Sequence, residues 1–123
     1  MSTGAAPSTA QQAAAVTAAG EHDVTILLTN NVATGSMQQQ FANALYDSGA
    51  EVVTAAVRNP YDIAKLPQAP DFIATYSYSP VALTSLAKVI VGEVGPRGTL
   101  PVDVMSVEDP DEVLYPFGAG LTW

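Results

Sequence analysis

Three short polar segments follow apolar stretches of this chain, and they hold the side chains best suited to chemistry. Their amide, guanidinium, phenol and carboxyl groups can hydrogen-bond the hydroxyls of a sugar, and the tyrosine rings offer a stacking face. In an open parallel sheet, ligands gather where loops leave the carboxyl ends of the strands. The candidate contact residues are Asn30, Asn31, Arg58, Asn59, Tyr61, Asp62, Tyr76 and Tyr78.

A structural interpretation of the same residues competes with this one. Asparagine is common in turns and at helix caps, and Arg58 can form an ion pair with Asp62 four positions later. We therefore favour contact of these loops with a neighbouring domain over direct contact with a sugar.

We assign no catalytic residue. Hydrolysis of a glycosidic bond with retention needs two carboxyl groups about 5 Å apart. The acids of residues 108–112 are instead typical of a solvated loop. His22, the only histidine, is flanked by Glu21 and Asp23 and is expected at the surface. Ser77 and Ser79 do not lie in the G-x-S-x-G elbow of serine hydrolases.

The sequence also carries no signature of a cofactor or a metal, and we expect neither. With a single histidine and no cysteine, a transition-metal site would rest on carboxylates alone. Residues 95–98 lack the Gly-Lys-[Ser/Thr] ending of a phosphate-binding loop. No G-x-G-x-x-G dinucleotide fingerprint follows the first apolar stretch.

The elements that must position the candidate side chains alternate between helix and strand. Capping boxes at Ser8 and Ser36 begin two helices, and Ser79 followed by Pro80 begins a third. Residues 24–29 and 52–57 are nearly continuous apolar runs, typical of strands buried on both faces. The predicted helical segments are 8–19, 36–49, 60–66 and 79–92, and the predicted strands are 24–29, 52–57, 71–75 and 100–104.

This order predicts an α/β fold with a three-layer, open, mainly parallel sheet of the flavodoxin-like or Rossmann-like kind. The 123 residues fit one domain. Within it, residues 1–22 form an Ala-rich helix with its lead-in, and residues 23–123 form the α/β unit. Two glycines near the end, Gly118 and Gly120, allow a sharp bend beneath packed aromatic rings, which would clasp the C-terminus onto the sheet.

Composition narrows the classes of partner. Four basic residues against twelve acidic ones give a formal charge of −8, which argues against nucleic acid and against an anionic membrane surface. No apolar run is long enough to span a bilayer. The Ala-rich start has no basic residue and is unlike a signal peptide, so we expect a cytoplasmic protein.

Four motifs, in order, resemble one family. Residues 115–123 (YPFGAGLTW) resemble the closing motif of the C-terminal α/β domain of glycoside hydrolase family 3. Residues 57–62 (VRNPYD) and 74–80 (ATYSYSP) are similar to strand exits in the β-N-acetylhexosaminidase branch of that family. Residues 92–102 resemble its G-x-x-x-P-x-G-x-L-P loop. The resemblance covers roughly residues 24–123.

The resemblance implies an accessory domain that supports a catalytic barrel, in the same chain or in another, and borders its active site. The family's nucleophilic aspartate and the histidine of this branch lie in that barrel, and their motifs have no counterpart here, so the chain alone is expected to be inactive. The resemblance also implies a first strand that this chain, which begins with a helix, does not supply. An exposed sheet edge would then favour the barrel or a homodimer. Parent members of the family are often secreted.

A second interpretation stays open. The chain would be a stand-alone, flavodoxin-like module that binds a ligand or a protein, or that serves in assembly. A catalytic barrel that accompanies the chain would favour the accessory domain, whereas saturable binding of an unrelated ligand by the isolated chain would favour the module.

Overall fold

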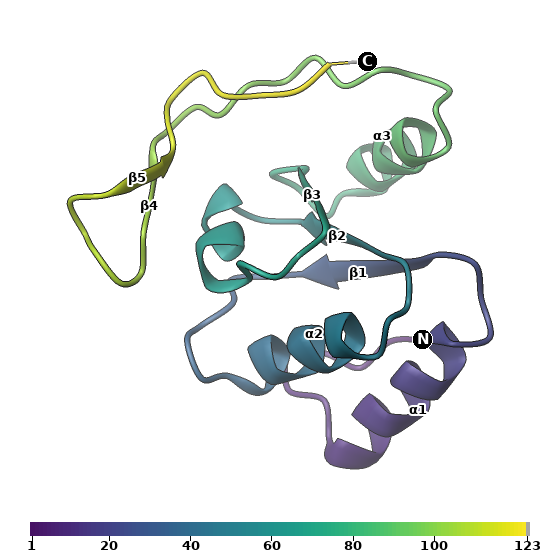
Figure 1. Cartoon of the computed structure of the whole chain (residues 1–123). Helices are drawn as coiled ribbons and strands as arrows, with labels where there is room; N and C mark the ends of the chain where they lie inside the picture. The colour runs from purple at the N-terminus through teal and green to yellow at the C-terminus, as the bar shows by residue number, and fades with distance from the viewer. Residues whose placement is uncertain (123) are drawn as a thin grey trace.

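The structure, a computed structural model, describes residues 1–122, which form an α/β fold around a three-stranded parallel sheet (Figure 1). The strands, in spatial order, are β1 (Thr25–Thr29), β2 (Val52–Ala56) and β3 (Asp71–Ala74). Thr25 lies opposite Val52, and both neighbouring pairs of strands are parallel. The polar segments that follow the three strands therefore leave the sheet at the same end.

Helices cover both faces of this sheet, so the predicted three-layer α/β class is confirmed. In Figure 1, α1 and α2 lie below the sheet and α3 lies above it. The predicted helical turn after β2 is a 3₁₀ helix. The helices are α1 (Thr9–Ala19), α2 (Met37–Asp47), η1 (Pro60–Lys65) and α3 (Pro80–Ile90). Among the described residues, no helix combines the length and the apolar composition that a bilayer crossing requires.

Local hydrogen bonds explain where α1 and α3 begin. The Ser8 hydroxyl accepts from the Gln11 N–H at 3.3 Å, and the Gln11 side chain accepts from the Ser8 N–H at 2.9 Å. This is the predicted capping box, in which two free donors at the helix start are satisfied reciprocally. The Ser79 hydroxyl likewise accepts from the Ala82 N–H at 3.3 Å ahead of α3.

The capping box predicted at Ser36 is only half formed. The Ser36 hydroxyl accepts from the Gln39 N–H, but the Gln39 side chain does not return to Ser36. Its oxygen accepts from the Gly35 N–H at 2.6 Å, and its nitrogen donates to the Lys65 carbonyl at 2.7 Å. The start of α2 is therefore tied to the end of η1, a contact between segments far apart in sequence.

The core lies between the sheet and the α1–α2 layer. Side chains from α2 pack against β1, β2 and the end of η1, and β2 is buried along most of its length. Burial of aliphatic and aromatic side chains of this kind is the main source of folding free energy. The core cluster consists of Ala19, Leu27, Val32, Phe41, Ala42, Leu45, Val52 and Leu66.

The expectation that residues 24–29 are buried on both faces is wrong. Leu27 faces the core, but Ile26 and Leu28 on the other face are 49% and 48% exposed. The reason is topological: β1 is one of the two edge strands, and a hollow of about 250 Å³ separates its outer face from Leu83 and Leu86 of α3. The α3 layer therefore covers β1 incompletely.

The predicted strand at residues 100–104 does not join the parallel sheet. Instead, β4 (Val104–Met105) pairs antiparallel with β5 (Val113–Tyr115) in a small ribbon that stands apart from the sheet (Figure 1). Val104 is fully buried, and β4 lies against η1. This contact anchors an otherwise exposed C-terminal arm, which we define as residues 95–122.

The predicted C-terminal clasp exists but closes on a different segment. The Gly118 N–H donates to the Leu100 carbonyl at 2.8 Å, and the Leu100 N–H donates to the Ala119 carbonyl at 2.7 Å. The end of the chain is thus held by the start of the arm rather than by the sheet, and the ring of Phe117 is 71% exposed rather than packed. Trp123, the last residue of the expected clasp, lies outside the described residues.

Candidate functional site

A buried carboxylate connects the first two exit segments. Asp62, on η1, is 1% exposed. Its Oδ2 accepts from the Thr29 hydroxyl at 2.7 Å, and its Oδ1 accepts from the Val32 N–H at 2.8 Å. The expected ion pair with Arg58 is wrong, because Asp62 points into the interior whereas Arg58 is exposed. Asp62 therefore holds the loop after β1 from the interior of the fold.

Gln38 holds the same loop from the side of α2. Its Oε1 accepts from the Asn30 N–H at 2.8 Å, and its Nε2 donates to the Asn30 carbonyl at 3.1 Å. This paired contact satisfies both backbone groups of Asn30 and leaves the Asn30 side chain free to project. Sequence reasoning missed Gln38 and Thr29. The available signal was a glutamine on the apolar stripe of α2, where a polar side chain needs a buried partner.

Asn31 and Asn59 meet across the exits of β1 and β2. The Asn59 amide donates to the Asn31 side-chain oxygen, and the Asn59 side chain also caps η1 by accepting from the Tyr61 N–H at 3.0 Å. Asn31 has a φ of +52°, a left-handed conformation that asparagine tolerates better than most residues. The structure thus brings Asn31, Asn59 and Asp62 into one fixed loop region.

Three exposed tyrosines complete the end of the sheet. Tyr61 follows β2, whereas Tyr76 and Tyr78 follow β3, and all three rings are at least two-fifths exposed. Tyr76 has a φ of +58°, which is unusual for a bulky side chain and costs free energy. Partial burial raises the pKa of Tyr76 above its usual value of 10.0. No hydrogen bond within residues 1–122 ties Arg58 or any of these three phenols to the asparagines.

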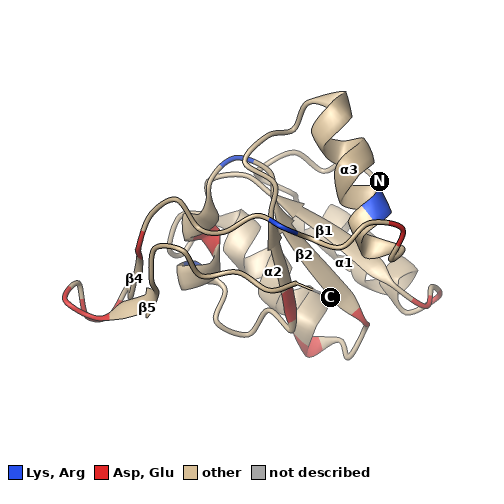
Figure 2. Cartoon of the chain, turned by 90° about the horizontal axis from the view of Figure 1, so that it is seen from above, with Lys and Arg blue, Asp and Glu red and all other residues tan. Residues whose placement is uncertain are grey.

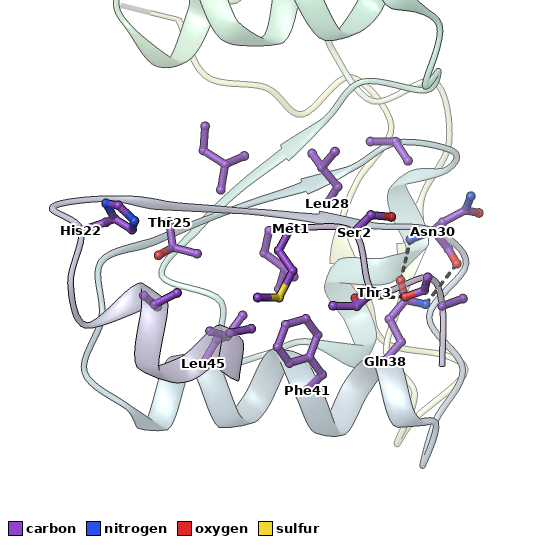
Figure 3. A pocket seen from close by; sticks show the side chains of 18 of the residues that line it. Met1, Ser2, Thr3, His22, Thr25, Leu28, Asn30, Gln38, Phe41 and Leu45 are labelled. Carbon is purple, nitrogen blue, oxygen red and sulfur yellow. Dashed lines mark hydrogen bonds between the residues drawn. The ribbon is translucent and has the colours of Figure 1, made fainter. Parts of the chain in front are cut away.

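A larger hollow, which sequence reasoning missed, lies beside β1 (Figure 3). It measures about 660 Å³ and is bounded by β1, α1, α2 and residues 1–5. His22 lies at one end, whereas Asn30 and Gln38 lie at the other, with Phe41 rising from α2 between them. Its lining is mainly apolar and includes no carboxylate. The hollow can therefore accept apolar atoms but offers no pair of acids for hydrolysis.

The acids of the arm do not supply that chemistry either. Glu108, Asp109, Asp111 and Glu112 are all exposed in the turn between β4 and β5. Among residues 1–122, no group of three or more histidines or acids is placed to hold a metal ion. The arrangement at the strand ends is a polar and aromatic surface, whose side chains can form hydrogen bonds and stacking contacts.

Comparison with known proteins agrees with this geometry. The sequence profile of the glycosyl hydrolase family 3 C-terminal domain matches residues 3–123. The structure of a glycoside hydrolase family 3 β-N-acetylglucosaminidase from Paenibacillus sp. str. FPU-7 superposes with a TM-score of 0.72 at 29% sequence identity. The superposition includes 77% of this chain and 18% of the Paenibacillus chain. No curated protein sequence matches significantly.

A second solved structure gives the same result. It contains a fungal multi-domain GH3 β-N-acetylglucosaminidase described as having a GCN5-related glucosamine N-acetyltransferase region. The TM-score is 0.68 at 29% identity, over 82% of this chain and 12% of that protein. The present chain thus spans less than a fifth of either protein. The resemblance carried by the four sequence motifs is confirmed, and the chain belongs to the glycosyl hydrolase family 3 C-terminal domain family.

Proposed function

We propose that this chain is the accessory C-terminal domain of a family 3 β-N-acetylglucosaminidase. It supports a catalytic barrel, borders the mouth of the active site and does not cleave substrate by itself. The observation that carries the proposal is how much of each protein the matches include. The family profile matches nearly the whole chain, yet the chain corresponds to only 18% and 12% of two β-N-acetylglucosaminidases.

The strand-exit loops support a bordering role. Asp62 and Gln38 fix the loop after β1 from two sides, so that its exposed amides are held in place before any partner arrives. Preorganised polar groups lose little conformational entropy on binding. We assign contact with the barrel or with its substrate to Asn30, Asn31, Arg58, Asn59, Tyr61, Tyr76 and Tyr78, and a purely positioning role to Asp62.

The C-terminal arm supports a docking role. Large apolar side chains are exposed along it, and Leu121 reaches 80%. Exposed apolar groups that gather on one segment commonly mark a protein–protein contact. We assign this surface to the catalytic barrel. Its large exposed apolar residues are Met105, Val107, Val113, Leu114, Tyr115, Phe117 and Leu121.

The second candidate is a stand-alone module that binds a ligand or a protein. The hollow of about 660 Å³ beside β1 favours it, because the size suits a small molecule or a short segment of chain. Self-association through the free edge of β1 is a separate proposal, which requires no barrel. The boundary placed at residue 22 stays a prediction, and Ala19 of α1 already belongs to the core.

Hydrolysis of an aryl N-acetylglucosaminide tests the accessory role. The chain is assayed alone and as a replacement for the C-terminal domain of a family 3 β-N-acetylglucosaminidase, beside the same enzyme without any such domain. We expect no turnover by the chain alone and more turnover by the replacement enzyme than by the enzyme without the domain. Turnover by the purified chain that survives removal of trace contaminants would overturn the proposal. Saturable binding of a small ligand, with no effect on the barrel, would favour the module.

A further inference from the structure

Tyr76, the second residue after β3, has a backbone conformation that its neighbours hold in place. Its φ is +58°, in the left-handed region that bulky side chains rarely adopt. The Thr75 N–H donates to the Ala56 carbonyl at 2.9 Å, and the Thr75 hydroxyl donates to the Ser77 carbonyl at 2.8 Å. These bonds anchor the segment on β2 and link the residues on both sides of Tyr76. Strained residues that are held in this way gather at sites that contact ligands.

The start of α3 fixes the residues that follow Tyr76. The Ser77 hydroxyl accepts from the Ser79 N–H at 3.1 Å, and the Ser79 hydroxyl accepts from the Ala82 N–H at 3.3 Å. The serines of this segment thus bond its own backbone, whereas within residues 1–122 neither the Tyr76 phenol nor the Tyr78 phenol forms a hydrogen bond. The two rings are 42% and 65% exposed. Two aromatic rings with free phenols therefore project from a fixed backbone.

The side chains around Tyr76 carry hydroxyl groups and no charge. Each of residues 75–79 (TYSYS) has a hydroxyl, and no residue from 72 to 87 is charged, although the chain as a whole carries −8. In Figure 2, α3, which begins directly after this segment, is tan apart from a single blue band. Phenol and hydroxyl groups both donate and accept hydrogen bonds, as the hydroxyls of a sugar do. The segment therefore matches a neutral partner that is rich in hydroxyl groups.

The C-terminal arm offers a surface of a different kind. Its large exposed side chains are mainly aliphatic, as at Leu114 and Leu121, and such groups suit a protein surface. The segment after β3 presents aromatic rings among hydroxyls instead. A pyranose ring has C–H groups on its face, which pack on an aromatic ring, and hydroxyls at its edge, which form hydrogen bonds. Of the two surfaces, the arm thus fits a protein partner and the segment around Tyr76 fits a sugar.

We infer that Tyr76 contacts the sugar substrate: its ring stacks on a pyranose ring of the N-acetylglucosaminide held by the barrel, and it adds to substrate affinity without taking part in bond cleavage. This role rests on the proposed accessory function, and it assigns Tyr76 to the substrate in place of the barrel. N-acetylglucosamine is neutral, as is the segment from residue 72 to residue 87. Because the backbone of Tyr76 is held before the substrate arrives, the ring loses little conformational entropy on binding.

Kinetics of an enzyme that carries this chain as its C-terminal domain test the inference, with N,N′-diacetylchitobiose as the substrate. Tyr76→Leu removes the ring but keeps an apolar side chain on the same backbone. We expect its KM to rise at least about tenfold and its kcat to stay within about twofold, since the lost contact is made equally in the ground state and the transition state. Tyr76→Phe keeps the stacking face and should leave both constants within about twofold. Val81→Ala, at a position of α3 that is 77% exposed, is the control and should change neither constant.

Stability measurements separate this role from a structural one. The midpoint of chemical denaturation of the full chain should be the same for Tyr76→Leu as for the parent. An unchanged KM in Tyr76→Leu would overturn the inference, as would an equal rise in Tyr76→Phe, a rise that comes with a lowered midpoint, or a lowered melting temperature of the assembled enzyme at unchanged KM, which would assign the ring to the barrel. A parent chain that adds no turnover to the barrel would reject the accessory role, and the inference with it. An active parent enzyme that Tyr76→Leu leaves unaffected would reject the inference alone.

Discussion

The Asp62 carboxylate accepts a hydrogen bond of 2.7 Å from the Thr29 hydroxyl, and both side chains are almost completely buried. This contact joins η1 to the last residue of β1, so two segments 33 positions apart share one polar contact inside the core. A buried carboxylate is costly unless hydrogen bonds satisfy it, and here the Val32 N–H supplies the second bond. The loop after β1 therefore depends on a residue that it does not contain.

Asp62→Ala should destabilise the fold by about 2–3 kcal/mol, because it leaves the Thr29 hydroxyl and the Val32 N–H without a partner. Chemical denaturation, followed by circular dichroism, measures the change. Arg58→Ala is the matched control: Arg58 is exposed and forms no ion pair with Asp62, so its loss should change the stability by no more than about 0.5 kcal/mol. A large effect of Arg58→Ala together with a small effect of Asp62→Ala would reverse this assignment.

Tyr46 should make stability fall at alkaline pH. Burial raises the pKa of its phenol above 10.0, although the hydrogen bond with Thr54 partly opposes the rise. Because the unfolded chain then loses the proton first, the contribution to stability is fully present below pH 10 and is lost as the pH rises through the pKa of the folded state. Denaturation from pH 8 to pH 11 tests this expectation.

Tyr46→Phe removes the titrating phenol group but keeps the packing of the aromatic ring. The variant should lose about 1 kcal/mol at neutral pH, because the buried Thr54 hydroxyl loses its partner at 2.8 Å. Its free energy of unfolding should also fall less above pH 10 than that of the parent chain. An unchanged fall in Tyr46→Phe would assign the alkaline effect to other tyrosines.

Gly120→Ala should open the C-terminal clasp. A Cβ at this position would lie 2.6 Å from the Gly98 carbonyl oxygen, a backbone atom that cannot rotate away. The Gly118 N–H, which bonds the Leu100 carbonyl, should then exchange with solvent at least about tenfold faster. Hydrogen exchange measured by NMR reports this, with Thr122→Ala as the neighbouring control. Equal protection in both variants would show that the backbones can separate at little cost.

Phe117→Asp tests the arm as the docking surface for a barrel. Phe117 is 71% exposed and contributes little to the core, so the variant should keep the stability of the parent chain. In an enzyme that carries this chain as its C-terminal domain, the same change should lower kcat/KM at least about tenfold, because a charge replaces an aromatic anchor. Val81→Asp, equally exposed but on α3, should leave the rate unchanged. Equal losses in both variants would contradict a specific role of the arm.

Local chemistry made much of the fold predictable. The helix starts at Ser8 and Ser79 follow from side chains that bond the first turn, and the apolar β2 is buried as its composition predicts. The exit residues Asn31 and Asn59 meet because the carboxyl ends of parallel strands lie at the same end of the sheet. This rule of topology can be applied to the sequence alone.

The predictions that were wrong have a different origin. Each concerns a residue whose environment is set by a segment far away in the sequence. Ile26 is apolar whether or not a helix covers it, and only the packing of α3 over the sheet shows that it stays partly open. Residues 100–104 have the composition of a core strand, but their backbone hydrogen bonds go to residues 115–119 of the same arm rather than to the sheet. From the sequence, Asp62 could bond either Arg58 or Thr29, and only the fold shows that its carboxylate points inward to Thr29.

The left-handed backbone of Tyr76 has an energetic consequence. Such a conformation costs on the order of 1–3 kcal/mol for a bulky residue, and glycine would adopt it without that penalty. Tyr76→Gly would therefore remove backbone strain from the folded chain, and it would also remove a ring that is 42% exposed directly after β3. At this position the domain carries an aromatic contact surface at the expense of its own stability.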